Sequence, residues 1–205
     1  MIRGLDHVVR VVLDLDIAVV EHRKRGFTVT PGGEHAGGLT HNALVGFQDG
    51  SYLELIAFHD LAAAGGKHSW APVAERGGGW ADFALLSNDV AEDAAPLGEL
   101  VARPPEDGGR TRPDGVRISW RVARLVKPLP FLIEDLTARD LRVPHGAAAL
   151  HANGTTGVAS IVLGATDPVR VAERYARLRE RGAPDVEVRR ADRDGLLDVS
   201  FGPGT

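Results

Sequence analysis

Two stretches of sequence decide the fold: residues 4–16, GLDHVVRVVLDLD, and residues 51–58, SYLELIAF. Each is an apolar, strand-like run with one ionisable side chain in its middle, His7 in the first and Glu54 in the second. Burying such a group costs free energy unless it is paired or bound to a metal. Because imidazole and carboxylate groups are both ligands for divalent metals, the two runs predict that His7 and Glu54 share a metal site.

Composition limits the classes of function. The chain has 205 residues, a net charge of -4 and no cysteine. Without cysteine there are no disulfides, no thiolate nucleophile and no cysteine-ligated zinc, so any metal is held by His, Asp or Glu. The acidic balance does not favour nucleic acid as a partner, and no apolar run is long enough to span a membrane. No signal-peptide pattern is recognisable, so the expected location is the cytoplasm.

The order of elements repeats along the chain. The first copy is a strand over 5–12, a helix that opens at Asp14 or Asp16 and runs to about residue 25, and strands over 27–30, 40–47 and 52–58. The second copy is a strand over 80–86, a helix over 89–100, and strands over 117–124 and 131–136. Segments 31–38 and 103–115 are rich in glycine and proline, which predicts loops.

Aligning the two copies places Asp82 at the position of His7 and Ile133 at the position of Glu54. A third, partial copy closes the chain: a strand over 158–163, a helix over 168–181 and a hairpin of 185–190 with 196–201. The expected fold class is α+β, with modules at 1–62 and 78–140 and a C-terminal unit at 155–205, all in one compact domain.

This order resembles the vicinal oxygen chelate superfamily, and more narrowly its glyoxalase-like domain group (the glyoxalase, bleomycin-resistance and dioxygenase type). The matching segments are LDHVVRVVLDLD, GFTVTPGGEHAGGLTHNALVGF and SYLELIAF, with weaker matches at GRTRPDGVRISWR, PFLIED and HANGTTG. The resemblance implies paired βαβββ modules, a curved mixed sheet around a cavity, and a divalent metal (zinc, manganese, iron or nickel). A partial βαββ unit follows them at the C-terminus. The superfamily contains enzymes and metal-free binding proteins, so the resemblance implies a fold more firmly than a reaction.

Each candidate site residue has a functional and a structural interpretation. The expected metal ligands are His7, Glu54 and Asp82; structurally, His7 is a core histidine, Glu54 pairs with an arginine, and Asp82 caps a turn or pairs with a surface base. Asn42 and His151 are the expected catalytic residues, His151 as a general base. The alternative for His151 is an exposed loop histidine. The expected substrate-binding residues are Arg112, Arg121, His35 and Tyr52, and the two arginines are equally suited to surface ion pairs.

Three functions agree with these patterns. The favoured one is a metal-dependent lyase, isomerase or dioxygenase that chelates adjacent oxygens of a small metabolite. The second is a metal-free protein that sequesters an aromatic or antibiotic ligand, with Trp70, Trp80, Trp120 and Tyr52 lining the pocket. The third is a scaffold with a filled cavity. The expected partner is a small-molecule substrate, and a homodimer is the candidate assembly.

Overall fold

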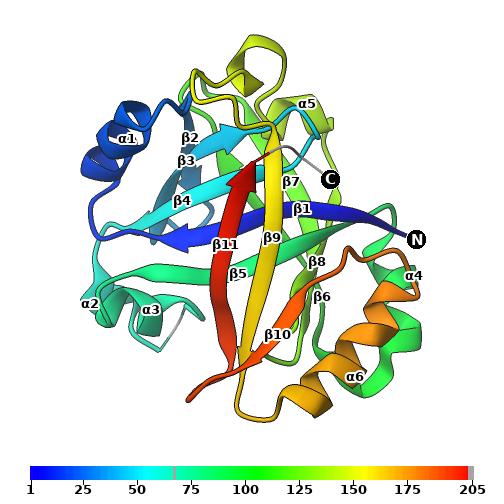
Figure 1. The fold of residues 1–205 in the computed structure, drawn as a ribbon. Helices are drawn as coiled ribbons and strands as arrows, with labels where there is room; N and C mark the ends of the chain where they lie inside the picture. The colour runs from blue at the N-terminus through cyan, green and yellow to red at the C-terminus, as the bar shows by residue number, and fades with distance from the viewer. Residues whose placement is uncertain (67, 203–205) are drawn as a thin grey trace.

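The computed structural model describes residues 1–66 and 68–202. Within them, the strands of the first copy are β1 (Ile2–Val11), β2 (Thr30–His35), β3 (Thr40–Gly46) and β4 (Tyr52–Phe58). Those of the second copy are β5 (Gly79–Ser87), β6 (Val101–Thr111), β7 (Arg117–Leu125) and β8 (Phe131–Asp135). These strands form a closed barrel in the order β1-β4-β3-β2-β6-β7-β8-β5. The expected α+β class with a curved mixed sheet is confirmed (Figure 1).

The helices connect and cover the strands. Asp14, rather than Asp16, caps α1 (Leu15–Lys24): its carboxylate accepts a hydrogen bond from the Ile17 amide at 2.9 Å. The helix expected over 89–100 divides into α4 (Val90–Ala94) and a 3₁₀ segment (Ala95–Leu100), where Pro96 opens the turn and Gly98 has a φ of 55°. The remaining helical segments are α2 (Leu61–Ala64), α3 (Ala71–Glu75), α5 (Arg139–Arg142), a 3₁₀ turn (Gly146–Ala149) and α6 (Pro168–Arg179).

The two segments expected to be loops, 31–38 and 103–115, are strand over most of their length, and only residues 36–38 and 112–115 lie outside the strands. Residues 31–35 belong to β2 and residues 103–111 to β6, and the pairing of His35 with Arg110 joins the two copies on this side of the barrel. Their glycines permit close packing rather than a loop. An ideal Cβ on Gly32 would lie 1.9 Å from Oδ1 of Asn42, so only glycine lets these strands approach one another here.

A second, three-stranded sheet contains β9 (Gly157–Ala165), β10 (Glu187–Arg190) and β11 (Gly195–Gly202). The hairpin expected between the last two strands is wrong, because β10 and β11 lie on opposite sides of β9. β10 pairs with β9 in parallel and β11 pairs with it antiparallel. The reason is the crossover through α6, which returns the chain to the starting end of β9 and makes the next strand parallel.

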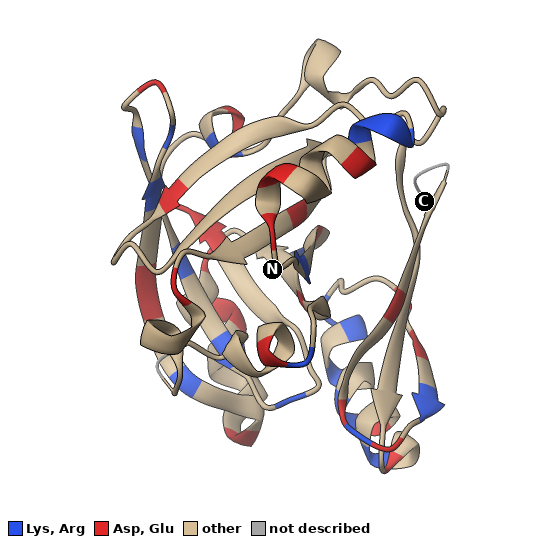
Figure 2. Cartoon of the chain, turned by 90° about the vertical axis from the view of Figure 1, so that its left-hand side faces the viewer, with Lys and Arg blue, Asp and Glu red and all other residues tan. Residues whose placement is uncertain are grey.

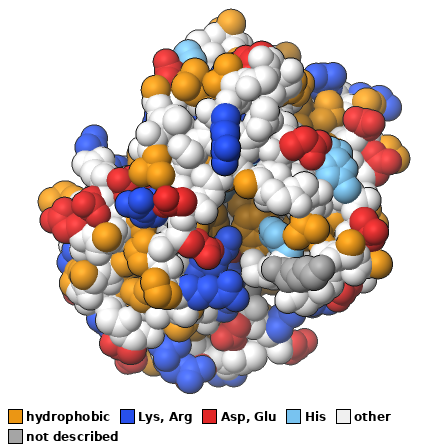
Figure 3. Space-filling model, turned by 180° about the vertical axis from the view of Figure 1, so that it is seen from behind, with side chains coloured by type: hydrophobic (Ala, Val, Ile, Leu, Met, Phe, Trp, Pro, Cys, Tyr) orange, Lys and Arg blue, Asp and Glu red, His pale blue; other side chains and the backbone are white. Residues whose placement is uncertain are grey.

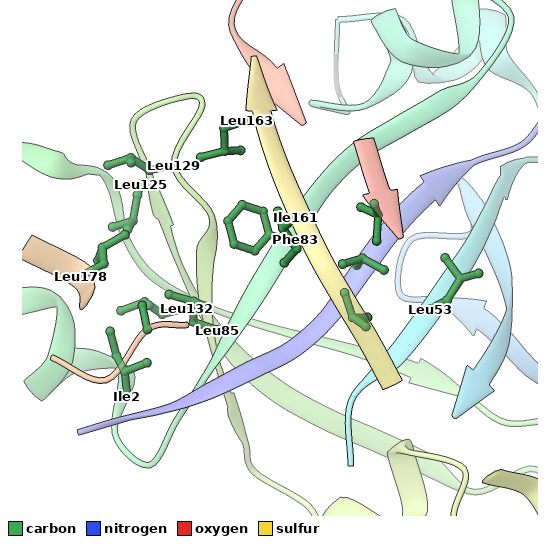
Figure 4. Close-up of a cluster of buried hydrophobic side chains, with 14 of the residues drawn as sticks. Ile2, Leu53, Phe83, Leu85, Leu125, Leu129, Leu132, Ile161, Leu163 and Leu178 are labelled. Carbon is green, nitrogen blue, oxygen red and sulfur yellow. The ribbon is translucent and has the colours of Figure 1, made fainter. Parts of the chain in front are cut away.

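Both faces of the central strands are covered, which explains their almost uninterrupted apolar sequence. The outer face packs against the C-terminal sheet and α6, and Figure 4 shows this layer, with Leu53, Phe83 and Leu85 of the barrel opposite Ile161 and Leu163 of β9. The inner face carries a separate apolar cluster that includes Val9, Ile56, Trp70 and Phe131. Each central strand therefore contributes alternate side chains to the outer apolar layer and to the inner cluster. Only the inward-facing residues reach the interior of the barrel.

Charged residues of both signs are distributed over the barrel and over the C-terminal sheet with α6 (Figure 2). In the described part of the chain, no helix has the length and hydropathy needed to cross a bilayer.

Candidate functional site

The barrel encloses a cavity of about 250 Å³ that is open to solvent. The face of the molecule in Figure 3 is hollowed near its centre, with hydrophobic and histidine side chains in the depression. The polar side chains at the cavity include His7, His35, Asn42, Tyr52, Glu54, Arg110 and Arg142. The apolar and aromatic walls include Ile56, Trp70, Trp120, Val122, Phe131 and Ile133. Five of the sequence-predicted site residues therefore line one cavity.

His7 and Glu54 meet inside this cavity. Both side chains are buried, and Nε2 of His7 lies 3.7 Å from Oε2 of Glu54. The other ring nitrogen of His7, Nδ1, lies 2.6 Å from Oδ1 of Asp6. The His7 ring also stacks on Tyr52, its neighbour in the β1–β4 register, with ring centroids 4.5 Å apart. Asp6 and Tyr52 therefore fix the orientation of the imidazole, and Nε2 is the nitrogen directed at Glu54.

Asn42 and His35 hold the second oxygen of Glu54. The Asn42 amide donates a hydrogen bond to Oε1 at 2.6 Å, and Nε2 of His35 lies 3.4 Å from the same atom. Burial raises the pKa of Glu54, but hydrogen bonding and charge from His35, together with His7 and Asn42, lower it to about 2. Glu54 is consequently a carboxylate at any working pH. A group with so low a pKa is suited to bind a cation and poorly suited to act as a general base.

A buried ion cluster supports the site from behind. Arg142 donates hydrogen bonds to both oxygens of Asp6, at 2.9 and 2.8 Å, and to the Tyr52 hydroxyl at 2.7 Å. It also pairs with Asp135, which Arg139 contacts as well. Burial raises the pKa of Asp6, yet the charge and hydrogen bonds of Arg142 and His7 hold it well below its usual range. The cluster therefore keeps Asp6 ionised beside His7.

Besides Arg142, the cavity lining contains two further cationic side chains that the sequence analysis does not identify. Arg110 is 4% exposed, donates hydrogen bonds to the backbone oxygens of Gly32 and Arg142, and has no described carboxylate within ion-pair distance. Arg124 lies over the rings of Trp70 and Phe131, 5.9 and 5.5 Å from their centroids. The sequence gives no signal for Arg110, because its glycine- and proline-rich segment is typical of a loop. Arg124 does have a signal: it alternates with Trp120 and Val122 along one strand, so the three side chains share a face.

The structure does not bring Asp82 to His7 and Glu54. Its carboxylate accepts hydrogen bonds from the indole of Trp70 at 3.2 Å and from the Phe83 amide, and it pairs with Lys127. In the β1–β5 register Asp82 lies opposite Val9, whereas His7 lies opposite Ala84. The antiparallel pairing of the two copies therefore displaces Asp82 along the barrel, away from His7. The contacts of Asp82 agree with its structural interpretation, an ion pair with a surface base.

The two predicted substrate-binding arginines lie outside the cavity lining. Arg121 alternates with the inward residues of β7, so it points outward, where its Nε lies 2.7 Å from Asp107. Arg112 pairs with Asp114 at 2.8 Å and donates a hydrogen bond to the Leu141 backbone at 3.1 Å. Arg112 and Arg121 therefore form surface ion pairs, the structural alternative to substrate binding.

His151 is not among the residues that line the cavity, and both its ring nitrogens are engaged. The Thr28 amide donates to Nδ1 at 3.0 Å, and Nε2 lies 2.9 Å from the Gly46 carbonyl oxygen. Its ring packs edge-on against Phe27 and Phe47. Burial lowers the pKa of His151, against the opposing hydrogen bond to Gly46. This histidine ties the 150–154 loop to the barrel, and the geometry does not support a role as general base.

Known proteins with similar sequences or folds share this architecture. The sequence profile of the glyoxalase-like domain matches residues 5–179. A hypothetical protein from Staphylococcus aureus has the same fold, with a TM-score of 0.75 and 14% identity over 96% of this chain and 89% of that chain. A methylmalonyl-CoA epimerase variant from Streptomyces coelicolor, solved with 2-nitronate-propionyl-CoA, is 25% identical over 67% of this chain and 100% of that chain, with a TM-score of 0.48. The Mycobacterium tuberculosis methylmalonyl-CoA epimerase is 20% identical over 65% and 89%, with a TM-score of 0.44. No curated protein matches this chain.

Proposed function

We propose that this chain, which belongs to the glyoxalase-like domain family of the vicinal oxygen chelate superfamily, is a metal-dependent enzyme acting on a small, oxygen-rich, anionic metabolite. One observation carries the proposal: inside the barrel cavity, Nε2 of the buried His7 lies 3.7 Å from Oε2 of the buried Glu54. Nδ1 of His7 lies 2.6 Å from the Asp6 carboxylate, which orients the ring so that Nε2 is the nitrogen available to a metal. In its neutral, Nδ1-protonated form the His7 ring would direct one lone pair, and the Glu54 carboxylate another, at a cation placed between them.

The donor set fits a divalent metal of the predicted group, zinc, manganese, iron or nickel. His7 and Glu54 would hold it, with Asp6 as the outer partner that orients the imidazole. When bound, such an ion chelates adjacent oxygens and stabilises an enolate-type anion. Asp82, the third ligand expected from the sequence, would have to leave Trp70 and Lys127 to take part.

His35 is the residue we assign to proton transfer in place of His151. Its Nε2 faces the cavity beside Glu54, and its Nδ1 lies 2.9 Å from the Thr40 hydroxyl. An imidazole has two ring nitrogens that can donate or accept a proton, which suits a residue that carries a proton between two groups. Among the described residues, the ligand atoms of His7, His35 and Glu54 do not form a triad within 4.8 Å. This spacing favours His35 as a proton carrier in a lyase or isomerase over the two-histidine, one-carboxylate set of iron dioxygenases.

Arg110 and the aromatic walls define the substrate. The buried guanidinium of Arg110 lacks an ion-pair partner among the described residues, so a substrate carboxylate would compensate its charge. Asn42 orients Glu54, and Trp120 and Phe131 form apolar walls against which the carbon skeleton of a substrate would pack. The open space of about 250 Å³ accommodates a small metabolite and argues against a filled scaffold.

The second candidate is a metal-free binding protein. The observation that favours it is the aromatic wall of Trp70, Trp120 and Phe131 beneath Arg124, which suits a flat ligand. In this function Glu54 would remain held by Asn42 and His35 alone.

Metal content separates the two candidates. The chain is purified without added ions, and bound metal is measured beside the His7→Ala variant and a His145→Ala control, which alters an exposed histidine outside the cavity. The enzyme proposal expects near-stoichiometric metal that depends on His7 and not on His145. Metal content unaffected by His7→Ala, with no thermal stabilisation by zinc, manganese, iron or nickel that depends on His7, would favour the binding protein. Mass spectrometry of a retained ligand identifies the substrate, and sedimentation checks the predicted homodimer.

A further inference from the structure

We propose that Glu34, His41 and His59 form a second metal site, on the outer face of the barrel, that binds zinc(II). One ligand atom from each of the three side chains lies within 4.8 Å of the other two. Among the described residues, no other group of three potential metal ligands has its ligand atoms this close together. The site is separate from the cavity and does not depend on the proposed function.

Strand pairing brings the three residues together. Glu34 on β2 is the direct cross-strand partner of His41 on β3, and the His59 amide donates to the Leu39 carbonyl oxygen at 3.1 Å at the end of β4. The neighbouring residues, His35 and Thr40, line the cavity. Because side chains alternate across a strand, Glu34 and His41 point to the outside. In Figure 1, α1 lies next to β3 and β4 of the barrel.

The three side chains are already in contact with one another. Nε2 of His59 lies 2.6 Å from Oε2 of Glu34, and the rings of His41 and His59 stack with centroids 4.2 Å apart. No described residue hydrogen-bonds a ring nitrogen of His41, so its lone pair is free. Glu34 and His59 are 56% and 42% exposed, which gives an ion access from solvent.

Two imidazoles and one carboxylate are the donor set of open, three-ligand zinc sites, in which water or another group completes the coordination. Magnesium prefers oxygen ligands in an octahedral arrangement and is a poor fit. A zinc ion here would connect β2, β3 and the end of β4. The inward neighbours of its ligands, His35 and Thr40, are bonded to each other at 2.9 Å, so the ion would also stiffen the wall that carries His35.

The test is a calorimetric titration of the chelator-treated full chain with zinc(II), beside His41→Gln, His59→Gln and a His145→Gln control. We expect each of the first two variants to weaken one zinc site by at least about tenfold, and the control to leave it unchanged. His59→Gln alters an exposed side chain and therefore serves if His41→Gln misfolds.

A zinc titration of the His7→Gln variant, followed by nuclear magnetic resonance of the histidine rings, distinguishes this site from the cavity. In that variant, zinc should shift the ring signals of His41 and His59, and magnesium should shift neither. Zinc affinity unchanged in both His41→Gln and His59→Gln, or ring shifts confined to other histidines, would overturn the inference. Loss of the His7-dependent metal alone would affect only the proposed function.

Discussion

Nδ1 of His7 lies 2.6 Å from Oδ1 of Asp6, although the two residues are consecutive on β1. In an uninterrupted strand their side chains would point to opposite faces. The register of β1 against β5 shifts between Leu5 and His7, and this irregularity lets the carboxylate reach the imidazole of the next residue. The pair thereby determines which nitrogen of His7 faces Glu54.

We expect Asp6→Asn to weaken metal binding at the cavity by about 10- to 100-fold, because the amide no longer fixes the His7 tautomer or strengthens its basicity. Calorimetric titration with zinc or manganese measures the change. Asp135→Asn is the matched control, since it disturbs Arg139 and Arg142 without contacting His7. Equal losses in both variants would contradict an orienting role for Asp6.

Replacement of Arg142 by Met should reduce the free energy of unfolding by about 3–5 kcal/mol, because Asp6 and Asp135 would lose a buried cationic partner. Urea denaturation measures the loss. Arg121→Met removes the exposed pair with Asp107 and should cost at most about 1 kcal/mol. A similar loss of unfolding free energy in both variants would show that burial does not determine how much the ion pairs of Arg142 contribute to stability.

Glu54 gives the stability a defined dependence on pH. Its pKa falls from 4.5 to about 2 on folding, so its contribution is complete above about pH 4.5 and is lost as pH falls through about 2. The free-energy advantage of the unaltered chain over Glu54→Gln should therefore shrink by about 1–3 kcal/mol between pH 6 and pH 2. Urea unfolding at several pH values tests this. Glu173→Gln, on an exposed position of α6, should follow the unaltered chain at every pH.

Gly32→Ala should disturb the site through packing alone. The added Cβ would lie 1.9 Å from Oδ1 of Asn42, so the amide that holds Glu54 must move. We expect a loss of about 1–3 kcal/mol in stability, measured by denaturation, and weaker metal binding at the cavity. Gly195→Ala meets no atom within 4 Å and should change stability by less than about 1 kcal/mol. Unchanged stability and metal binding in Gly32→Ala would contradict the close contact.

The sequence by itself determined the repeated strand–helix–strand order and predicted that His7 and Glu54 lie in one place, where the structure brings them together. Alternation along β1 and β4 predicts which residues share a face, and an ionisable group among apolar neighbours indicates a site. Apolar runs on strands buried on both faces are also a local signal, and they identified β1, β4 and β5. The glycine-rich β2 and β6 lack that signal, so the closure of the barrel and the position of Arg110 were not predictable from it.

Only the tertiary structure decided which distant groups meet. The antiparallel register places Asp82 beside Val9 rather than His7, and Lys127 then neutralises it. Arg142 reaches Asp6 across the fold, and His151 is held by Thr28 and Gly46 rather than directed into the cavity. Sequence periodicity states which face of an element a side chain occupies, but contacts between elements depend on register and packing, which no local pattern records.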